Sequence, residues 1–146
     1  MKERDKEKGV LVLYFREMFF NDFKFRVFDK ETGKIYPVSV VSFFAGFISI
    51  GDPYDFDNWH VRSESDVVVM RFAGMVDKYG RDIFEGDVVK AEGVGIPLLV
   101  MVENGCFVLK PKEDAVVLFL LCAWKPDQLE VVGNKWENPG LLEEKG

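Results

Sequence analysis

Short apolar runs separated by turn-forming residues are the feature that most narrows what this chain can fold into. In the second half of the chain the runs are, in order, VVVMRF, VVKAE, PLLVMVE, CFVLK and AVVLFLL. Most of the segments between them are short and carry Gly, Pro or Asn, which favour tight turns. Strands of about five residues at such spacing predict a small antiparallel barrel or sandwich. AVVLFLLCAW could instead form a short helix.

The first half of the chain predicts a β-hairpin region. In FKFRVF, apolar residues alternate with Lys24 and Arg26, which is the pattern of a half-buried strand. DKETGK follows as a turn in which Gly33 can adopt a positive φ. IYPVSVVSFF then begins a second strand, and FFAGFISI continues it to residue 50. GDPYDFDN is rich in turn residues and predicts a loop.

Both ends of the chain predict short additions to this β structure. Residues 1–9 are mostly charged and predict a solvated tail, while residues 10–21 favour a helix over a strand because their apolar residues recur at steps of three and four. The apolar run Val10–Phe15 is too short to cross a bilayer, so we expect neither a signal peptide nor a transmembrane helix. At the other end, QLEVVG predicts a closing strand. Asn138 and Pro139 then offer an N-cap and a first residue for a short helix.

The composition supports a folded domain and weighs against some partners. Of the 146 residues, 48% are hydrophobic and 30% are charged, which is enough to build a core in a soluble domain. The net charge of −6 argues against non-specific binding to nucleic acid or to an anionic membrane. Cys106 and Cys122 lie among apolar residues, so we expect both to be small buried hydrophobic side chains in a cytosolic protein. Two cysteines and one histidine make no zinc site.

Three blocks of sequence carry a family resemblance. They are KFRVFDK at Lys24–Lys30, AGMVDKYGRDIFEGDVV at Ala73–Val89 and EVVGNKWENPGLL at Glu130–Leu142. In this order they resemble the YopX family of phage and prophage proteins. This chain differs from the family pattern in having Phe28 for a Trp, Tyr79 for an Asn and Gly140 for a Glu. The resemblance implies a phage or prophage origin and an SH3-like barrel in the C-terminal half, and it implies no established activity.

Together these patterns predict an α+β fold that is mainly β. We expect an N-terminal extension over residues 1–21 and a β-rich hairpin region over residues 22–65. This region would pack with an SH3-like small antiparallel β-barrel over residues 66–146, which ends in a short C-terminal segment. Few helices are expected, and all of them short.

Four carboxylates lie close together in the connection between two predicted strands: Asp77, Asp82, Glu85 and Asp87. Carboxylates on a loop can bind a metal ion or act as acid and base. Asp beside Gly is also what a tight turn needs, because the Asp side chain binds nearby backbone N–H groups. We favour the turn role, with Ile83 and Phe84 turned toward the core.

The candidate partner-contact residues fall into two groups. Lys24, Arg26 and Arg71 lie beside aromatic residues on predicted strands, where they could form a modest strip for nucleic acid or an ordinary solvated face. Trp124, Trp136 and Asn138 lie in predicted loops or near the C-terminus, where an exposed Trp can anchor an interface. The segment GNKWENP is the one we expect to meet another subunit.

No catalytic constellation accompanies these residues. His60 could act as a base, but no Ser or Cys nucleophile stands in a recognisable setting, and GVGI lacks the Lys and spacing of a phosphate loop. We therefore predict a non-enzymatic protein-binding or oligomerisation module without a cofactor, in the cytoplasm of a bacterial host. Its partner would be a second copy or a host or phage protein. The alternatives are a nucleic-acid-binding small barrel and a metal-assisted hydrolase that uses the acidic loop.

Overall fold

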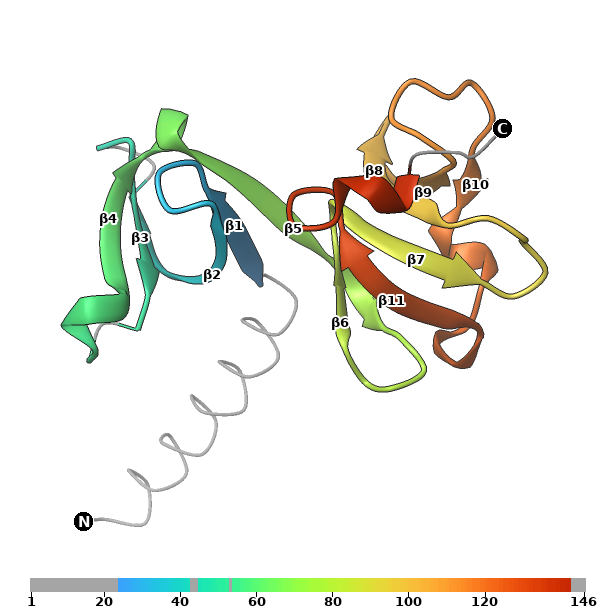
Figure 1. Cartoon of the computed structure of the whole chain (residues 1–146), viewed down its shortest axis with the longest axis horizontal. Helices are drawn as coiled ribbons and strands as arrows, with labels where there is room; N and C mark the ends of the chain where they lie inside the picture. Colours follow the sequence, from blue (N-terminus) through green and yellow to red (C-terminus); the bar gives the residue numbers. More distant parts are fainter. Residues whose placement is uncertain (1–23, 43–44, 53, 143–146) are drawn as a thin grey trace, which may run out of the picture.

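The computed structural model describes residues 24–42, 45–52 and 54–142. Two antiparallel sheets dominate this part of the chain, and they form two lobes joined by one long strand (Figure 1). The first sheet has the order β4-β3-β2-β1-β5-β6, and the second has the order β10-β9-β8-β7-β11. The expectation of a mainly β chain is confirmed.

The first sheet takes its strands from the first 84 residues. They are β1 (Phe25–Asp29), β2 (Lys34–Ser42), β3 (Phe47–Gly51), β4 (Trp59–Ser63), β5 (Val67–Val76) and β6 (Asp82–Phe84). The strands of the second sheet are β7 (Asp87–Ala91), β8 (Leu98–Glu103), β9 (Cys106–Lys110), β10 (Phe119–Leu120) and β11 (Leu129–Asn134). The helices described are short 3₁₀ turns: η1 (Phe56–Asn58), η2 (Glu64–Asp66), η3 (Leu121–Ala123), η4 (Pro126–Gln128) and η5 (Pro139–Leu142). None of these helices is long and apolar enough to span a membrane.

The predicted hairpin is present as β1 and β2. Phe28 lies opposite Ile35, and the turn closes through Gly33, whose φ is +73°. The predicted continuation of the second strand to residue 50 is wrong, because a turn at residues 45–46 ends the strand and β3 folds back on β2. Gly46 has a φ of +69°, which glycine adopts without the steric cost that a Cβ brings. β4 was not predicted, although its first four residues alternate between apolar and polar side chains: Trp59, His60, Val61 and Arg62.

β5 runs from one lobe into the other. Its first half pairs with β1 and its second half pairs with β6 across a register shift between Phe72 and Val76. The predicted long connection after VVVMRF is therefore a hairpin, because the strand continues to Val76 before it turns. The predicted boundaries 22–65 and 66–146 stay a prediction, but strands from both sides of residue 66 pair in the first sheet.

Each lobe has its own hydrophobic core. In the N-terminal lobe, residues from β1, β3 and β5 pack together, with Tyr36 and Val38 of β2 partly buried against them: Val27, Ile48, Ile50 and Val67. The larger core belongs to the second sheet and takes in Ile83 from β6: Ile83, Val89, Ala91, Leu98, Val100, Leu109, Leu121 and Leu129. Ile83 is fully buried, as expected.

The second sheet is open in the described residues. β10 and β11 lie at its two edges and do not pair with each other, so the expected SH3-like barrel is not confirmed. Of the run AVVLFLL, only Phe119 and Leu120 form a strand, and η3 follows it directly. The C-terminal helix is a 3₁₀ turn, η5, rather than an α-helix.

Two further predictions concern the cysteines and the N-terminal residues. Cys106 and Cys122 are both exposed, so the prediction that they are buried is wrong. Cys106 lies next to the tight turn between β8 and β9, and Cys122 lies in η3 with its side chain turned from the core that holds Leu121. The predicted tail and helix over residues 1–21 lie outside the described residues.

Candidate functional site

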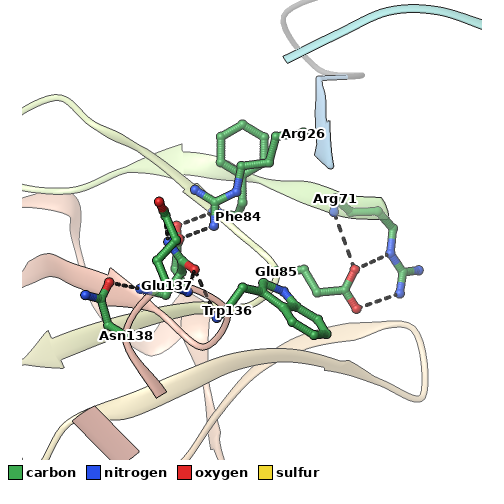
Figure 2. Close-up of polar contacts among 9 residues, drawn as sticks. Arg26, Arg71, Phe84, Glu85, Trp136, Glu137 and Asn138 are labelled. Atoms are coloured by element: carbon green, nitrogen blue, oxygen red, sulfur yellow. Dashed lines mark hydrogen bonds and ion pairs between the residues drawn. The ribbon is translucent and has the colours of Figure 1, made fainter. Parts of the chain in front are cut away.

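The four carboxylates of the acidic connection point to four different sets of partners. Lys24 binds Asp82 at 3.2 Å, Arg71 binds Glu85 at 3.0 Å, and Arg26 binds Asp87. Figure 2 shows the two-bond pair of Arg71 with Glu85. Within the described part of the chain, no three His, Cys, Asp or Glu side chains are placed to share a metal ion. These contacts favour the structural role that we expected for the connection.

Asp77 organises the turn between β5 and β6. Its Oδ1 accepts hydrogen bonds from the backbone N–H groups of Tyr79 and Arg81, both at 2.9 Å, and its Oδ2 accepts one from Val131 of β11 at 3.0 Å. Burial would raise the pKa of Asp77, but these donors and the Arg81 guanidinium hold it below its usual value. The side chain is therefore a charged acceptor that ties the turn to the edge of the second sheet.

Asp87 lies in the junction between the two lobes. Its Oδ2 accepts the backbone N–H of Phe84 at 2.8 Å, and Arg26 of β1 reaches it across the lobes. Burial raises the pKa of Asp87 above its usual value, although Arg26 and the Phe84 N–H act in the opposite direction. The Arg26 guanidinium also lies 4.7 Å from the centre of the Phe84 ring, as Figure 2 allows the reader to follow.

Lys24, Arg26 and Phe28 share one side of the chain and all face the C-terminal lobe. Phe28 stacks on Trp136 with ring centres 4.9 Å apart, while Lys24 and Arg26 pair with carboxylates. The expected alternation is present, but this face is covered by the second lobe rather than by solvent. Its two cations are bound within the chain, which leaves little charge for a phosphate backbone.

Trp136 and Asn138 lie in the segment that follows β11. Trp136 is half-buried beside a small cavity of about 120 Å³, whose lining includes Met70, Gly86 and Met101. The Oδ1 of Asn138 accepts the backbone N–H of Asn134 at 3.3 Å, so this side chain stabilises the bend after β11 (Figure 2). Both residues are used inside the chain, and whether they also meet a partner stays a prediction.

His60 packs against Tyr36, and the two ring centres lie 5.5 Å apart. The histidine is half-buried on β4 and pairs with Ile50 along the backbone. This agrees with the packing role rather than with a general base.

The edge at β11 is covered. The backbone N–H of Lys78 donates to the carbonyl of Leu129 at 2.9 Å, and the N–H of Val131 donates to Asp77. The terminal segment covers the far end of the strand, because a Cβ on Gly133 would lie 2.6 Å from Oδ1 of Asn138. Another strand could add here only by displacing the turn.

The edge at β10 is open. Phe119 and Leu120 pair with Leu109 and Val108 of β9, and no hydrogen bond from a described residue reaches their outer side. The five consecutive apolar residues that end in β10 are all exposed: Val116 at 95%, Val117 at 63%, Leu118 at 39%, Phe119 at 36% and Leu120 at 48%. We call Val116–Leu120 the open-edge segment.

Trp124 packs against Phe119 of the open-edge segment. Its ring meets Phe119 edge-on with centres 5.7 Å apart, and its Nε1–H donates to the carbonyl of Glu92 at 3.0 Å. Trp124 is therefore adjacent to the exposed surface, and its ring is partly packed on the core. Whether it meets a partner stays a prediction. The sequence did not predict that the residues before it would be exposed. The sequence contains no signal for this exposure, because the apolar run VVLFL predicts burial.

Comparison with known proteins finds one family model that spans the described residues, and solved structures with a similar fold. The family model described as YopX protein matches residues 24–143. No curated protein gives a significant match. The solved structure of protein EF1440 from Enterococcus faecalis is 22% identical with a TM-score of 0.57, and the match covers 83% of this chain and 98% of that one. Protein yopX from Bacillus subtilis is 20% identical with a TM-score of 0.59, and the match covers 84% and 99%. At these identities the likeness concerns the fold.

Proposed function

The chain belongs to the YopX protein family, and from this premise and the open edge at β10 we propose that it is a non-enzymatic protein-binding or oligomerisation module. The proposed binding surface is the open-edge segment, Val116–Leu120. The proposed setting is the cytoplasm of a bacterial host, with the protein as a phage or prophage product. A second copy or a host or phage protein would be the partner.

The exposure of the open-edge segment is the observation that carries the proposal. Folded proteins usually protect the edge of a sheet with charged residues, Pro or a covering loop, because unpaired backbone groups invite another strand. Here the segment has no charged residue, and its side chains add a contiguous apolar surface of the kind that marks interaction sites. An extended partner chain could pair with β10 and cover these side chains at once.

The two alternative functions find less support in the contacts described. Nucleic-acid binding needs cations that are free to meet phosphates, yet Lys24, Arg26 and Arg71 each bind a carboxylate of this chain. A metal-assisted hydrolase needs carboxylates that converge, yet Asp77 and Asp87 are held by different donors. Both observations favour a binding module over either alternative.

Replacing the two most exposed residues of the segment tests the proposal. We expect Val116→Asp combined with Val117→Asp to abolish binding to a protein partner, because two charges would have to be desolvated at the contact. Tyr54→Asp is the matched control, since Tyr54 is also 95% exposed and lies in the other lobe. The measurement is sedimentation velocity of the pure chain together with capture of host proteins on the immobilised chain. If the double variant binds the same proteins and associates as the wild type does, the open-edge segment is not the binding surface.

A further inference from the structure

We propose that Asn104 is a site of spontaneous covalent modification, at which the backbone nitrogen of Gly105 displaces the side-chain amide of Asn104 and water then leaves a carboxylate in its place. The two residues form the tip of the hairpin between β8 and β9. The inference does not depend on the proposed function, because the reaction takes place within one chain and needs only water.

The hairpin tip presents these two residues to solvent. Glu103 pairs with Cys106, so the loop between the strands consists of Asn104 and Gly105 alone. Their φ angles are +51° and +78°, and positive values at both positions are typical of a type I′ hairpin turn. Both residues are exposed. Hydroxide and water, which the reaction consumes, therefore reach both the attacking nitrogen and the amide.

Neither reacting group is engaged elsewhere. Among the residues that the structure describes, none forms a hydrogen bond with the Asn104 side chain or with the backbone N–H of Gly105. Gly105 carries no Cβ that would hinder its own nitrogen, and the space around it is open, since an added Cβ would meet nothing within 4 Å. An exposed hairpin tip also opens locally at little cost in free energy, which lets the amide swing toward the nitrogen.

The reaction balances without an oxidant or a reductant. The Gly105 nitrogen loses its proton to hydroxide and bonds to Cγ of Asn104, the bond from Cγ to Nδ2 breaks, and ammonia leaves. The product is a cyclic imide between the two residues. Water then opens the ring at one of its two carbonyl carbons. Opening at Cγ gives an aspartate, and opening at the backbone carbonyl gives an isoaspartate whose main chain runs through the former side chain.

The other described asparagines lack this combination of features. Asn104 is the one asparagine of the chain that glycine follows. The Nδ2 groups of Asn58 and Asn134 donate to nearby carboxylates at 2.7 and 2.8 Å, which holds their amides in place. Asn138 precedes Pro139, which has no backbone N–H to attack with. We therefore expect the modification to be selective for Asn104.

The isoaspartate product would change the hairpin itself. It lengthens the main chain of a turn whose length fixes the register of β8 and β9. Either product also adds a negative charge next to Glu103, whose carboxylate is bound to Lys110 at 2.6 Å. The pairing of Glu103 with Cys106 should therefore loosen as the modification accumulates.

Incubation of the full chain at mildly alkaline pH tests the proposal, with peptide mapping by mass spectrometry as the measurement. The peptide that contains Asn104 should gain the mass by which a carboxyl group exceeds an amide and should split into two chromatographic forms. Its rate of conversion should rise with pH, because the attacking nitrogen must lose a proton. We expect Asn104→Gln to abolish the change, since a longer side chain closes the ring poorly, and the control Asn58→Gln to leave it unaltered.

A parallel incubation in urea separates the chemistry of the sequence from that of the fold, with tryptophan fluorescence reporting whether each sample is folded. Conversion at Asn104 in the folded chain supports the proposal. If Asn104 is converted only in urea, the folded turn holds the nitrogen away from the amide and the proposal is overturned. Equal conversion at Asn58 or Asn134 in the folded chain would likewise overturn the selectivity that the structure assigns.

Discussion

The two edges of the second sheet are built in opposite ways. At β11 a buried carboxylate, a backbone hydrogen bond and the terminal segment occupy the outer side of the strand. At β10 the outer side is empty in the described residues, and the chain that leads to it is apolar and exposed. The comparison teaches that covering an edge takes dedicated polar residues. In this molecule the buried carboxylate, Asp77, stands in the acidic connection, for which the sequence favoured a turn role over a metal site.

The largest expected effect comes from removing the cover at β11. Asp77→Ala leaves the backbone N–H groups of Tyr79, Arg81 and Val131 without their acceptor, so we expect the free energy of unfolding to fall by about 3 kcal/mol. Urea denaturation followed by tryptophan fluorescence measures it. Asp114→Ala, a carboxylate near the open edge with no ion pair to a described residue, should change stability by less than about 0.5 kcal/mol. Equal losses in the two variants would erase the distinction between the edges.

The terminal segment provides a second way to disturb the covered edge. A Cβ at Gly133 would meet Asn138 and Leu141 at 2.6 and 2.7 Å, so we expect Gly133→Ala to cost about 1–2 kcal/mol. Gly95→Ala is the control, because a Cβ there would meet nothing within 4 Å. Thermal unfolding of the two variants gives the comparison. A Gly133→Ala protein as stable as the control would mean that the terminal segment does not hold the edge.

The pH dependence of stability should report the charge of Asp77. Its pKa is lowered on folding, so its ionised form contributes stability that is fully present above the unfolded pKa and is lost as the pH falls through the folded pKa. Asp77→Asn cannot titrate, and the stability gap between wild type and variant should therefore narrow in acid. Unfolding free energies of both proteins between pH 7 and pH 3 test this. A gap that is constant with pH would show that the charge itself contributes nothing.

The smallest effect on stability is expected at the open edge. Val116→Asp with Val117→Asp should leave the unfolding free energy of the dilute monomer within about 0.5 kcal/mol of the wild type, because both side chains already face solvent. Urea unfolding at low protein concentration measures this. A large loss would mean that the segment is part of the core rather than a binding surface.

The strands themselves could largely be predicted from the sequence. Alternation in FKFRVF and short apolar runs in the second half locate β1, β7, β8, β9 and β11. The turn role of Asp77 also follows from its sequence setting, because Asp and Gly residues surround the turn. These features depend on neighbours along the chain, so the local pattern contains the necessary information.

The faces of the strands could not be predicted in the same way. The alternation of apolar and polar residues correctly groups Lys24 with Arg26. It does not predict that the C-terminal lobe covers these two residues or that they form ion pairs with Asp82 and Asp87. The exposure of Cys106, Cys122 and the open-edge segment has the same origin. An apolar run predicts a core position wherever it occurs in the sequence. Only the order of strands in the sheet shows that β10 has a neighbouring strand on one side alone.

The path of β5 has a consequence for how the chain is made. This strand completes the first sheet by pairing with β1, yet it begins only at Val67, after the other strands of the N-terminal lobe have left the ribosome. The first sheet of the N-terminal lobe therefore cannot be completed until β5 has been synthesised, and the second half of β5 lies in the C-terminal lobe. Nascent chains released before β5 emerges should stay sensitive to protease, and those that include β5 and the hairpin partner β6 should resist it. Synthesis from the N-terminus thus couples the folding of one lobe to the start of the other.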